Sequence, residues 1–405
     1  MGAPVRTEAS GDRLHGLDAL RAVMMLLGLA LHAMVSYGPL RSLGEMWPYL
    51  DANTSVICDL AIVSIHAFRI PVFFVMAGYF SSMLYERRGA LGLMSNRLSR
   101  IGLPFIVGLL VVYPITRAGF VFATSTTQVG IAGAWSSVPP AMHSPYAQAN
   151  TIRPWFLYYL LYFYVAALLC ARLVEMLPAT VQARGRAVFE RITGSRWRVV
   201  LLAGLTALTL LPMRTASFDT SATFMPEFPT LSAYFVFFGF GWLLYGSRGL
   251  LKTFSRFAWT QCAVATVLFL PNFLALRAVW SGAPYGAFAR VVAAVSGGLI
   301  VWLLVFGLLG LFLRHFERPS AKIRYLVDAS YWLYLLHLPL AIWLPGLMSE
   351  WNAPALLKVA IVLGVMAPTL LGSYHLFVRS TAIGAVLNGR RYPAPIPFFR
   401  PRPRS

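Results

Sequence analysis

The first long apolar stretch of the chain carries two side chains that could act on one ligand. Arg21 and His32 are eleven residues apart, which on a helix is about 1,100°, or only about 20° from three full turns. They therefore share a face, about 16 Å apart along the axis, and Asp18 and Gly28 fall on the same stripe. Asp18 could pair with the arginine, and the glycine permits close approach by a ligand or helix. We predict a ligand with anionic phosphates at one end and a distant reactive group.

Two later apolar stretches also carry polar side chains far from their ends. His66 and Arg69 lie one turn apart in HAFRIPVFFVMAGYF, and His337 lies one turn after Tyr334 in RYLVDASYWLYLLHLPL. Ionisable groups are costly within a bilayer and usually face a protein interior or a wet cavity. The helical rise places them at a depth similar to that of His32, so we predict one shared polar chamber. A single histidine of this kind can also be only a hydrogen-bond partner between helices, and Tyr334 can be a packing residue.

A third candidate group precedes the third apolar stretch. Arg97 and Arg100 lie one turn apart in NRLSRIGLPF, and the planar guanidinium group suits two-point capture of phosphate. The same pair is equally explained as the positive flank of a membrane span, as the nearby Arg87 and Arg88 illustrate. The spacing alone does not separate these two interpretations.

Long apolar helices must hold these residues in place. The chain has 405 residues, of which 58% are hydrophobic and 12% charged, and its formal charge is +20. Soluble domains carry about 25% charged residues, and the cations here fall in short clusters between apolar runs, which argues against binding to nucleic acid. The composition therefore predicts an all-α, polytopic integral membrane protein. Stretches long enough to cross a bilayer predict about ten transmembrane helices, at 17–37, 59–83, 101–121, 155–177, 199–213, 231–246, 257–278, 288–313, 325–345 and 355–378.

The distribution of cations orients this arrangement. Most of the 34 lysines and arginines fall in alternate connections, which the positive-inside rule assigns to the cytoplasm. With an even number of spans, both termini are then cytoplasmic. We interpret residues 1–380 as one transmembrane domain and 381–405 as an Arg- and Pro-rich cytoplasmic tail. The three cysteines have neither disulfide nor metal-ligand spacing, and we expect no metal.

These residues also carry a resemblance to a known family. The chain resembles the acyltransferase family 3 membrane proteins, and within them the branch involved in glucan biosynthesis. The resemblance covers nearly the whole chain, in an ordered set of motifs: RAVMMLLGLALH, HAFRIPVFFVMAGYF, RLSRIGLP, PWFLYYLLYFY, YFVFFGFGWLLYG, RYLVDASYWLYLLHLPL and SYHLFVRSTAIGAVLNG. It implies an enzyme of the bacterial inner membrane that moves an acyl group from cytoplasmic acyl-coenzyme A (acyl-CoA) to a periplasmic sugar hydroxyl. Relatives of this branch are associated with succinyl transfer to glucans.

The family's functional residues map onto particular positions of this chain. Arg21 and His32 match the signature motif, and Arg97 and Arg100 match the pair thought to hold the coenzyme's phosphates. The chain departs from the pattern at Arg153-Pro154-Trp155, where many relatives have a histidine before the Leu-Trp of the fourth helix. This departure bears on the identity of the acceptor and of the acyl group.

The resemblance and the helical geometry together suggest a mechanism. The phosphates of the coenzyme bind Arg97 and Arg100, with Arg21 as a further ligand and catalytic residue, and the thioester reaches His32. That histidine is either a general base for the acceptor hydroxyl or a transient acyl carrier. Arg69 stabilises the thioester oxyanion or the distal carboxylate of a succinyl group.

The remaining expectations concern partners and alternatives. We expect His337 to be catalytic, and His66, Tyr334 and Asp18 to bind substrate. The expected partners are acyl-CoA as donor, a periplasmic glycan as acceptor, and the bilayer, with no permanently bound cofactor and the oligomeric state open. The alternative is a secondary transporter or flippase for a sugar or lipid-linked substrate. Transporters usually place carboxylates near mid-membrane, whereas the acidic residues here lie mostly near span ends.

Overall fold

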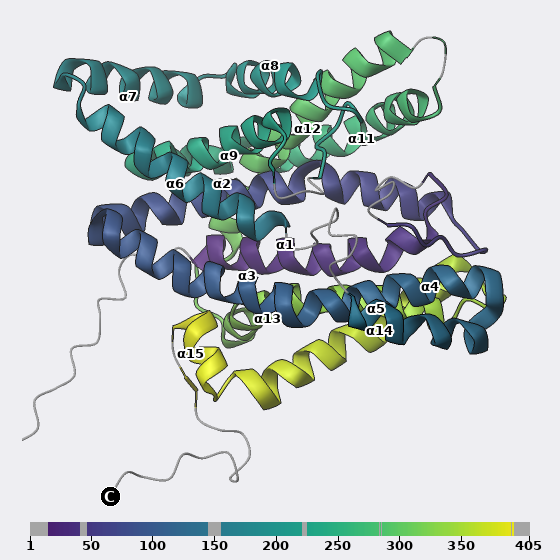
Figure 1. Ribbon diagram of the computed structural model, residues 1–405. Coiled ribbons are helices and arrows are strands. Elements are labelled where there is room, and N and C mark those ends of the chain that lie inside the picture. The colour runs from purple at the N-terminus through teal and green to yellow at the C-terminus, as the bar shows by residue number, and fades with distance from the viewer. Residues whose placement is uncertain are drawn as a thin grey trace, which may run out of the picture.

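The computed structural model describes residues 15–40, 47–144, 155–220, 225–282, 284, 286–389 and 391–392. These residues are predominantly helical and include no strand, as the composition predicts. The longer helices run roughly side by side in one bundle (Figure 1). Their bounds are α1 (His15–Met34), α2 (Val56–Arg97), α3 (Leu103–Val107), α4 (Tyr113–Ala134), α5 (Val138–His143), α6 (Trp155–Glu175), α7 (Ala179–Gly194), α8 (Arg198–Leu210), α9 (Phe228–Gly246), α10 (Leu251–Phe254), α11 (Ala258–Trp280), α12 (Gly286–His315), α13 (Ala321–Leu347), α14 (Ala355–Ser373) and α15 (Ala382–Asn388).

Eight helical stretches of the described chain are long and apolar enough to cross a membrane. They match the predicted spans, except that the second and third predicted spans lie within one stretch, 56–143. Gly89 divides that stretch, because its φ of 66° is a left-handed conformation that favours glycine. The fifth predicted span corresponds to α8, whose 13 residues are fewer than the ~20 that crossing needs. The multi-pass helical architecture is confirmed, while the exact number of crossings and the orientation of the termini stay predictions.

The helix α1 lies inside the bundle, in contact with α2, α12, α13 and α14 (Figure 1). Its apolar positions recur at helical spacing, and Leu17, Leu20 and Leu31 are at most 1% exposed. This pattern is typical of a helix that packs against neighbours along its length. Because helices surround α1, its polar side chains Arg21 and His32 face protein cavities.

Close packing against α9 holds α2, the helix that carries His66 and Arg69. A β-carbon at Gly78 would lie 2.0 Å from the Phe238 carbonyl oxygen. Reciprocally, a β-carbon at Gly241 of α9 would lie 1.9 Å from a carbonyl oxygen of α2. Glycines let membrane helices approach to backbone contact, so these two positions fix α2 against its neighbour.

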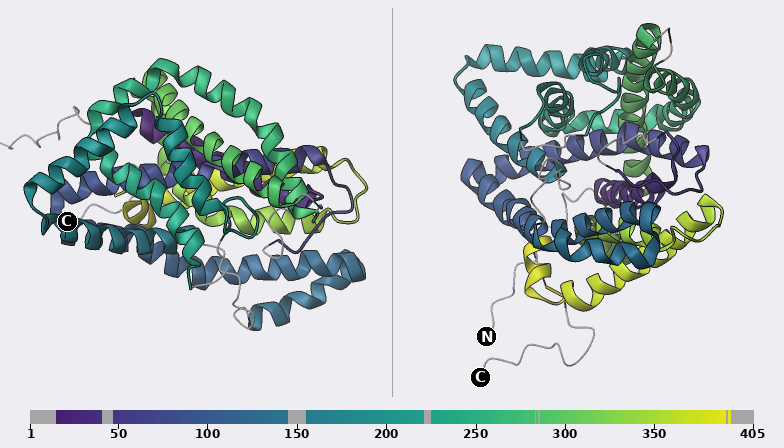
Figure 2. Two further views of the ribbon diagram at one scale, coloured as in Figure 1. Left: turned by 90° about the horizontal axis from the view of Figure 1, so that it is seen from above. Right: turned by 45° about the vertical axis from the view of Figure 1, so that its right-hand side comes forward.

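The two margins of the bundle differ in the helices that form them. The helices α7 and α8 lie along one margin, and α14 and α15 lie along the opposite one (Figures 1 and 2). The arginines of α7, Arg184, Arg186 and Arg191, are exposed, and this helix is too polar to be a membrane span. At the other margin α15 falls within the segment 381–405 that we interpret as a tail, yet it is helical and packs against the bundle.

Candidate active site

Polar side chains from three helices line one cavity, which we call the chamber. His32 of α1, His66 and Arg69 of α2, and Tyr334 and His337 of α13 surround a volume of about 90 Å³. The sequence predicts, from helical rise, that these groups lie at a similar depth in the membrane. The structure brings them together in one cavity wall. Their catalytic and binding roles stay predictions.

His32 and His337 are hydrogen-bonded to each other between α1 and α13. A distance of 3.0 Å joins His337 Nε2 to His32 Nδ1, and the ring centroids are 4.8 Å apart. Each ring also lies against a backbone carbonyl of its own helix. His337 Nδ1 is 2.6 Å from the Tyr334 carbonyl oxygen, and His32 Nδ1 is 2.9 Å from the Gly28 carbonyl oxygen.

These contacts determine where the protons lie when both rings are neutral. A carbonyl oxygen only accepts hydrogen bonds, so His337 donates its Nδ1–H to Tyr334 and its Nε2 is an acceptor. That Nε2 then accepts the Nδ1–H of His32, which leaves the lone pair of His32 on Nε2. A neutral histidine held in this tautomer can act as a general base through Nε2. When His32 takes up a proton, its Nδ1–H still donates to His337 and Gly28, which stabilises the imidazolium.

Arg69 is a buried cation in the same cavity wall. Its side chain is 8% exposed, and among the described residues it has no hydrogen bond or ion pair, with Nε buried and unpartnered. The guanidinium group lies against Gly28, where a β-carbon would be 1.9 Å from Nη1. The glycine on the Arg21–His32 stripe thus admits a side chain from α2. An uncompensated buried charge is unfavourable, so this group is suited to an anionic ligand.

His66 is hydrogen-bonded to a residue in a connection between two helices. Its Nε2 is 2.8 Å from the Phe218 carbonyl oxygen, so this nitrogen donates to the connection between α8 and α9. The half-buried ring forms part of the chamber wall. Trp155, the described part of the divergent Arg153-Pro154-Trp155 segment, also lines the chamber, whereas residues 153 and 154 lie outside the described residues.

Sequence reasoning missed Trp47, which contacts His32 from the side of the short connection 47–55. The two ring centroids are 5.8 Å apart, and the indole N–H donates to Ser36 Oγ at 2.8 Å. The same connection is anchored by Asp51, whose carboxylate accepts two 2.9 Å hydrogen bonds from Lys358 Nζ of α14. Both side chains of this ion pair are 0% exposed. In the sequence, the one sign of this ion pair is a lysine, Lys358, inside an apolar stretch.

A second, larger cavity lies where α1 begins and α2 ends, and we call it the vestibule. Its volume is about 740 Å³, and its wall includes the carboxylates Asp18 and Asp328. Its cations are Arg21, Arg87, Arg88, Arg97, Arg100, Arg248 and Arg324. The predicted pair Arg97 and Arg100 therefore shares a cavity with Arg21. Arg87 and Arg88, which the sequence suggests are only the positive flank of a membrane span, line the same cavity. Asp18 and Arg21 lie here and do not line the chamber.

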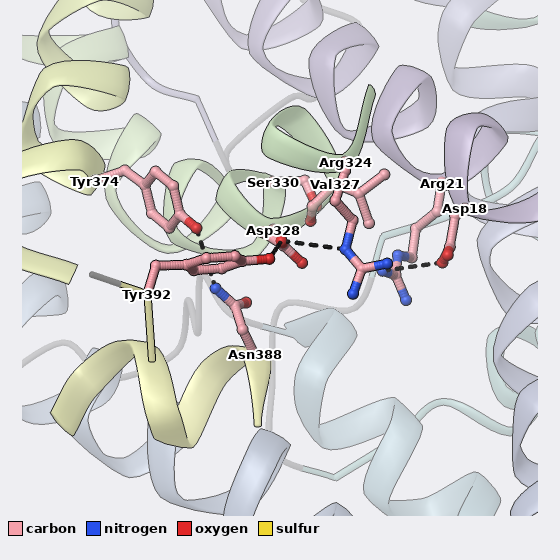
Figure 3. A network of polar contacts seen from close by, with 9 residues as sticks. All are labelled: Asp18, Arg21, Arg324, Val327, Asp328, Ser330, Tyr374, Asn388 and Tyr392. Carbon is pink, nitrogen blue, oxygen red and sulfur yellow. Dashed lines mark hydrogen bonds and ion pairs between the residues drawn. The ribbon is translucent and has the colours of Figure 1, made fainter. Parts of the chain in front are cut away.

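Two arginines of the vestibule are paired with carboxylates on their own helices (Figure 3). Arg21 lies 3.4 Å from Asp18, the pairing expected from their spacing, and Arg324 lies 3.3 Å from Asp328. Figure 3 also shows Tyr392, which follows α15 and donates to Asp328. The C-terminal segment therefore contributes to this wall.

Local irregularities in the helices position two further arginines of the vestibule, Arg97 and Arg100. Arg97 ends α2, donates to Ser81 Oγ at 3.2 Å and lies over the Tyr164 ring at 5.2 Å. Arg100 lies in the π-helical turn Leu98–Gly102. A second π-helical turn, Gly108–Val112, contributes its first and last residues to the chamber. Such turns are rare overall, but they occur frequently at functional sites. The hydrophobic pattern of the sequence does not reveal them.

These features define a class of protein. A multi-pass helical membrane protein that encloses a histidine pair beside a basic vestibule has the plan of a membrane-bound group-transfer enzyme. The chain belongs to the acyltransferase family 3: the family model described as an acyltransferase domain matches residues 14–378. It is therefore an O-acyltransferase, as the motifs suggest.

Similar curated proteins point to one branch of the family. The chain is 26% identical over 365 residues to the glucans biosynthesis protein C of Escherichia coli K12 (strain DH10B), covering 84% of this chain and 86% of that protein. It is also 26% identical over 361 residues to the protein of that name from E. coli O157:H7 (strain EC4115), with the same coverage. No solved structure matches the chain.

Proposed function

We propose that this acyltransferase takes an acyl group from acyl-CoA bound in the vestibule and transfers it, in the chamber, to a hydroxyl of an extracytoplasmic glycan. The observation that carries the proposal is the arrangement of the two cavities. Seven arginines line one cavity, and the other is lined by His32, whose hydrogen bonds at Nδ1 leave the lone pair of Nε2 available. A donor with phosphates at one end and a thioester at the end of a long arm matches that separation, which is about 16 Å between Arg21 and His32.

The proposed chemistry uses the tautomer of His32. Its Nε2 takes the proton of the acceptor hydroxyl as the oxygen attacks the thioester carbonyl. The carbon–sulfur bond of the tetrahedral intermediate then breaks, and the leaving thiolate takes the proton from His32 Nε2. Throughout, His337 accepts from His32 Nδ1–H and holds the ring in place. The products are the acyl ester and the free thiol of coenzyme A.

Arg69 supports a particular class of acyl group. Its guanidinium group is buried and has no partner among the described residues, which favours an anion in the chamber, and the small chamber favours a short acyl chain. We therefore propose succinyl ahead of acetyl as the transferred group. The free carboxylate of succinyl pairs with Arg69, and acetyl offers no such partner. The curated relatives are named for glucan biosynthesis, which favours a glucan as the acceptor.

We assign the vestibule to the cytoplasmic side of a bacterial inner membrane. Its arginines lie where positive charge gathers in cytoplasmic segments, and this side is where acyl-CoA is made. With about ten crossings, both termini lie on that side, and the chamber communicates with the opposite one.

Binding of coenzyme A tests the donor assignment. We expect coenzyme A to raise the melting temperature of the detergent-purified protein, and the Arg97→Ala/Arg100→Ala variant to lose that increase. The matched control is Arg184→Ala/Arg186→Ala, which removes two exposed arginines of α7 that lie outside the vestibule. A wild-type protein indifferent to coenzyme A would refute the donor assignment. Mass analysis of glycans from membranes given labelled succinyl-CoA or acetyl-CoA then identifies the acyl group.

A further inference from the structure

Two aromatic side chains form the wall between the vestibule and the chamber. Phe156 of α6 and Tyr334 of α13 line both cavities, and no other described residue does. Their ring centroids are 6.1 Å apart with an interplanar angle of 70°. Aromatic rings in edge-to-face contact have centroids about 4.5–7 Å apart, so the two rings are in contact where the two cavities meet.

The two rings are supported differently. Phe156 is 6% exposed and packs against two phenylalanines of α2, with centroid distances of 5.6 Å to Phe73 and 4.9 Å to Phe74. Tyr334 is only half-buried, and its aromatic neighbours besides Phe156 are Tyr331 and His337. Phe156 is thus fixed by its surroundings, whereas the Tyr334 ring borders cavities on two sides and has room to rotate.

Rotation of this ring need not disturb the histidine pair. The atom of Tyr334 that holds His337 is its backbone carbonyl oxygen, which belongs to α13 and stays in place when the side chain turns. The contact between His337 and His32 therefore persists with the passage open. The same residue can close the passage and orient the site.

A closed apolar passage is needed on physical grounds. The vestibule is strongly basic, and the chamber contains a cation that no described residue pairs with, so both attract water and anions. A continuous water path between them would carry ions and protons through the protein, and hydrophobic constrictions prevent such flow by excluding water.

We propose that Phe156 and Tyr334 form an aromatic aperture that admits a narrow, unbranched acyl thioester arm from the vestibule and otherwise seals the chamber. The proposal rests on the proposed function and deepens it, because the aperture sets donor specificity. Straight acyl chains pass between the rings, whereas an acyl group branched at the carbon next to the carbonyl is too wide and is excluded.

Donor selectivity tests the aperture. The variant Phe156→Ala widens it, and the control Phe163→Ala removes another buried phenylalanine of α6 that lines neither cavity. We compare kcat/KM for 2,2-dimethylpropanoyl-CoA with that for acetyl-CoA. Phe156→Ala should raise this ratio at least about tenfold, the scale of steric discrimination in a pocket, and Phe163→Ala should keep the wild-type ratio. An unchanged ratio in Phe156→Ala would overturn the aperture.

A second readout needs no donor. Each protein is reconstituted into liposomes with a pH gradient, and a trapped dye reports the decay of the gradient. We expect faster decay with Phe156→Ala than with Phe163→Ala or wild type. If none of the proteins consumes acyl-CoA, faster decay in Phe156→Ala still supports the aperture and refutes only the donor proposal. Equal decay in that case overturns the aperture as well.

Discussion

At the scale of single residues, the chamber relies on a neutral partner for His32. Its described wall holds no carboxylate, so the ring is oriented by His337 and by a backbone carbonyl rather than by an acid. The guanidinium group of Arg69 lies in the same wall. In the proposed function, the carboxylate of an anionic acyl group pairs with that cation.

Removing the partner of His32 should impair turnover more than binding. In His337→Ala the tautomer of His32 is no longer fixed, and general-base catalysis is worth about 10²–10⁴-fold. We expect kcat to fall by at least about tenfold while KM for acyl-CoA changes little. Steady-state kinetics with a glucan acceptor measure both constants. A variant with wild-type kcat would contradict the orienting role.

Arg69 should discriminate between acyl groups. Hydrogen bonds to charged groups contribute about 1.5–3 kcal/mol, so Arg69→Met should lower kcat/KM for succinyl-CoA about 10- to 100-fold more than for acetyl-CoA. The comparison of the two donors in one variant is its own control for folding. An equal loss with both donors would instead assign Arg69 to the thioester oxyanion.

The sequence predicts side chains within a helix better than contacts between helices. Arg21, His32 and Arg69 follow from helical period and rise, which are local properties, and the structure places them as expected. The hydrogen bond between His32 and His337 joins residues 305 positions apart, and no spacing encodes it. Trp47 lies in a short irregular connection, where periodicity gives no information.

At the scale of elements, the connection 47–55 joins the end of α1 to α14. The backbone N–H of Asp51 donates to the Ser36 carbonyl oxygen at 2.9 Å, and its carboxylate binds Lys358. The Tyr49 hydroxyl reaches the same carboxylate at 3.3 Å, which satisfies a further acceptor site. These contacts keep Trp47 against His32, so an ion pair outside the chamber supports the ring that we propose to be catalytic.

Breaking that ion pair on one side should destabilise the protein strongly. Removing one partner of a buried pair costs about 3–5 kcal/mol because the other charge is left uncompensated. We expect Lys358→Met to lower the melting temperature in detergent, and Asp51→Asn/Lys358→Met to recover most of the loss. Lys252→Met, which changes an exposed lysine, is the control. A double variant no more stable than the single one would show that charge compensation is not the cause.

The sequence predicts an element well where the length of an apolar stretch determines the helix. It predicts an element poorly where tertiary packing determines it. Long spans such as α6 and α12 follow from hydropathy alone. The helix α15 and the π-helical turns at 98–102 and 108–112 do not, because tertiary contacts stabilise them. Asn388 donates to the Tyr374 hydroxyl at 3.2 Å, a contact that links α15 to the turn after α14 and cannot be inferred from composition.

At the scale of the whole molecule, the two cavities lie in series along the bundle, with the vestibule at the end where α1 begins. In the proposed function, this order gives the protein a direction, with the donor at one face and the acceptor at the other. Under the same proposal, positive charge at the vestibule end both orients the protein in the membrane and attracts an anionic donor, so that one charge distribution serves insertion and binding.

Cysteine labelling in intact cells tests this direction. In a background free of native cysteines, Ala52→Cys in the connection 47–55 should react with a membrane-impermeant thiol reagent. Arg186→Cys in α7 should react only after the cells are opened. Both positions are exposed, so protection reports sidedness rather than burial. The reverse pattern would place the vestibule outside the cytoplasm.

We propose that His32 performs acyl transfer from acyl-CoA, and a comparison of His32→Gln with wild type tests this role directly. The purified proteins are given labelled succinyl-CoA and a glucan acceptor, and His143→Gln, an exposed histidine on α5, is the control. We predict that His32→Gln loses at least about 10²-fold in transfer while coenzyme A still raises its melting temperature. Full transfer by a folded His32→Gln protein would show that His32 is not the catalytic base.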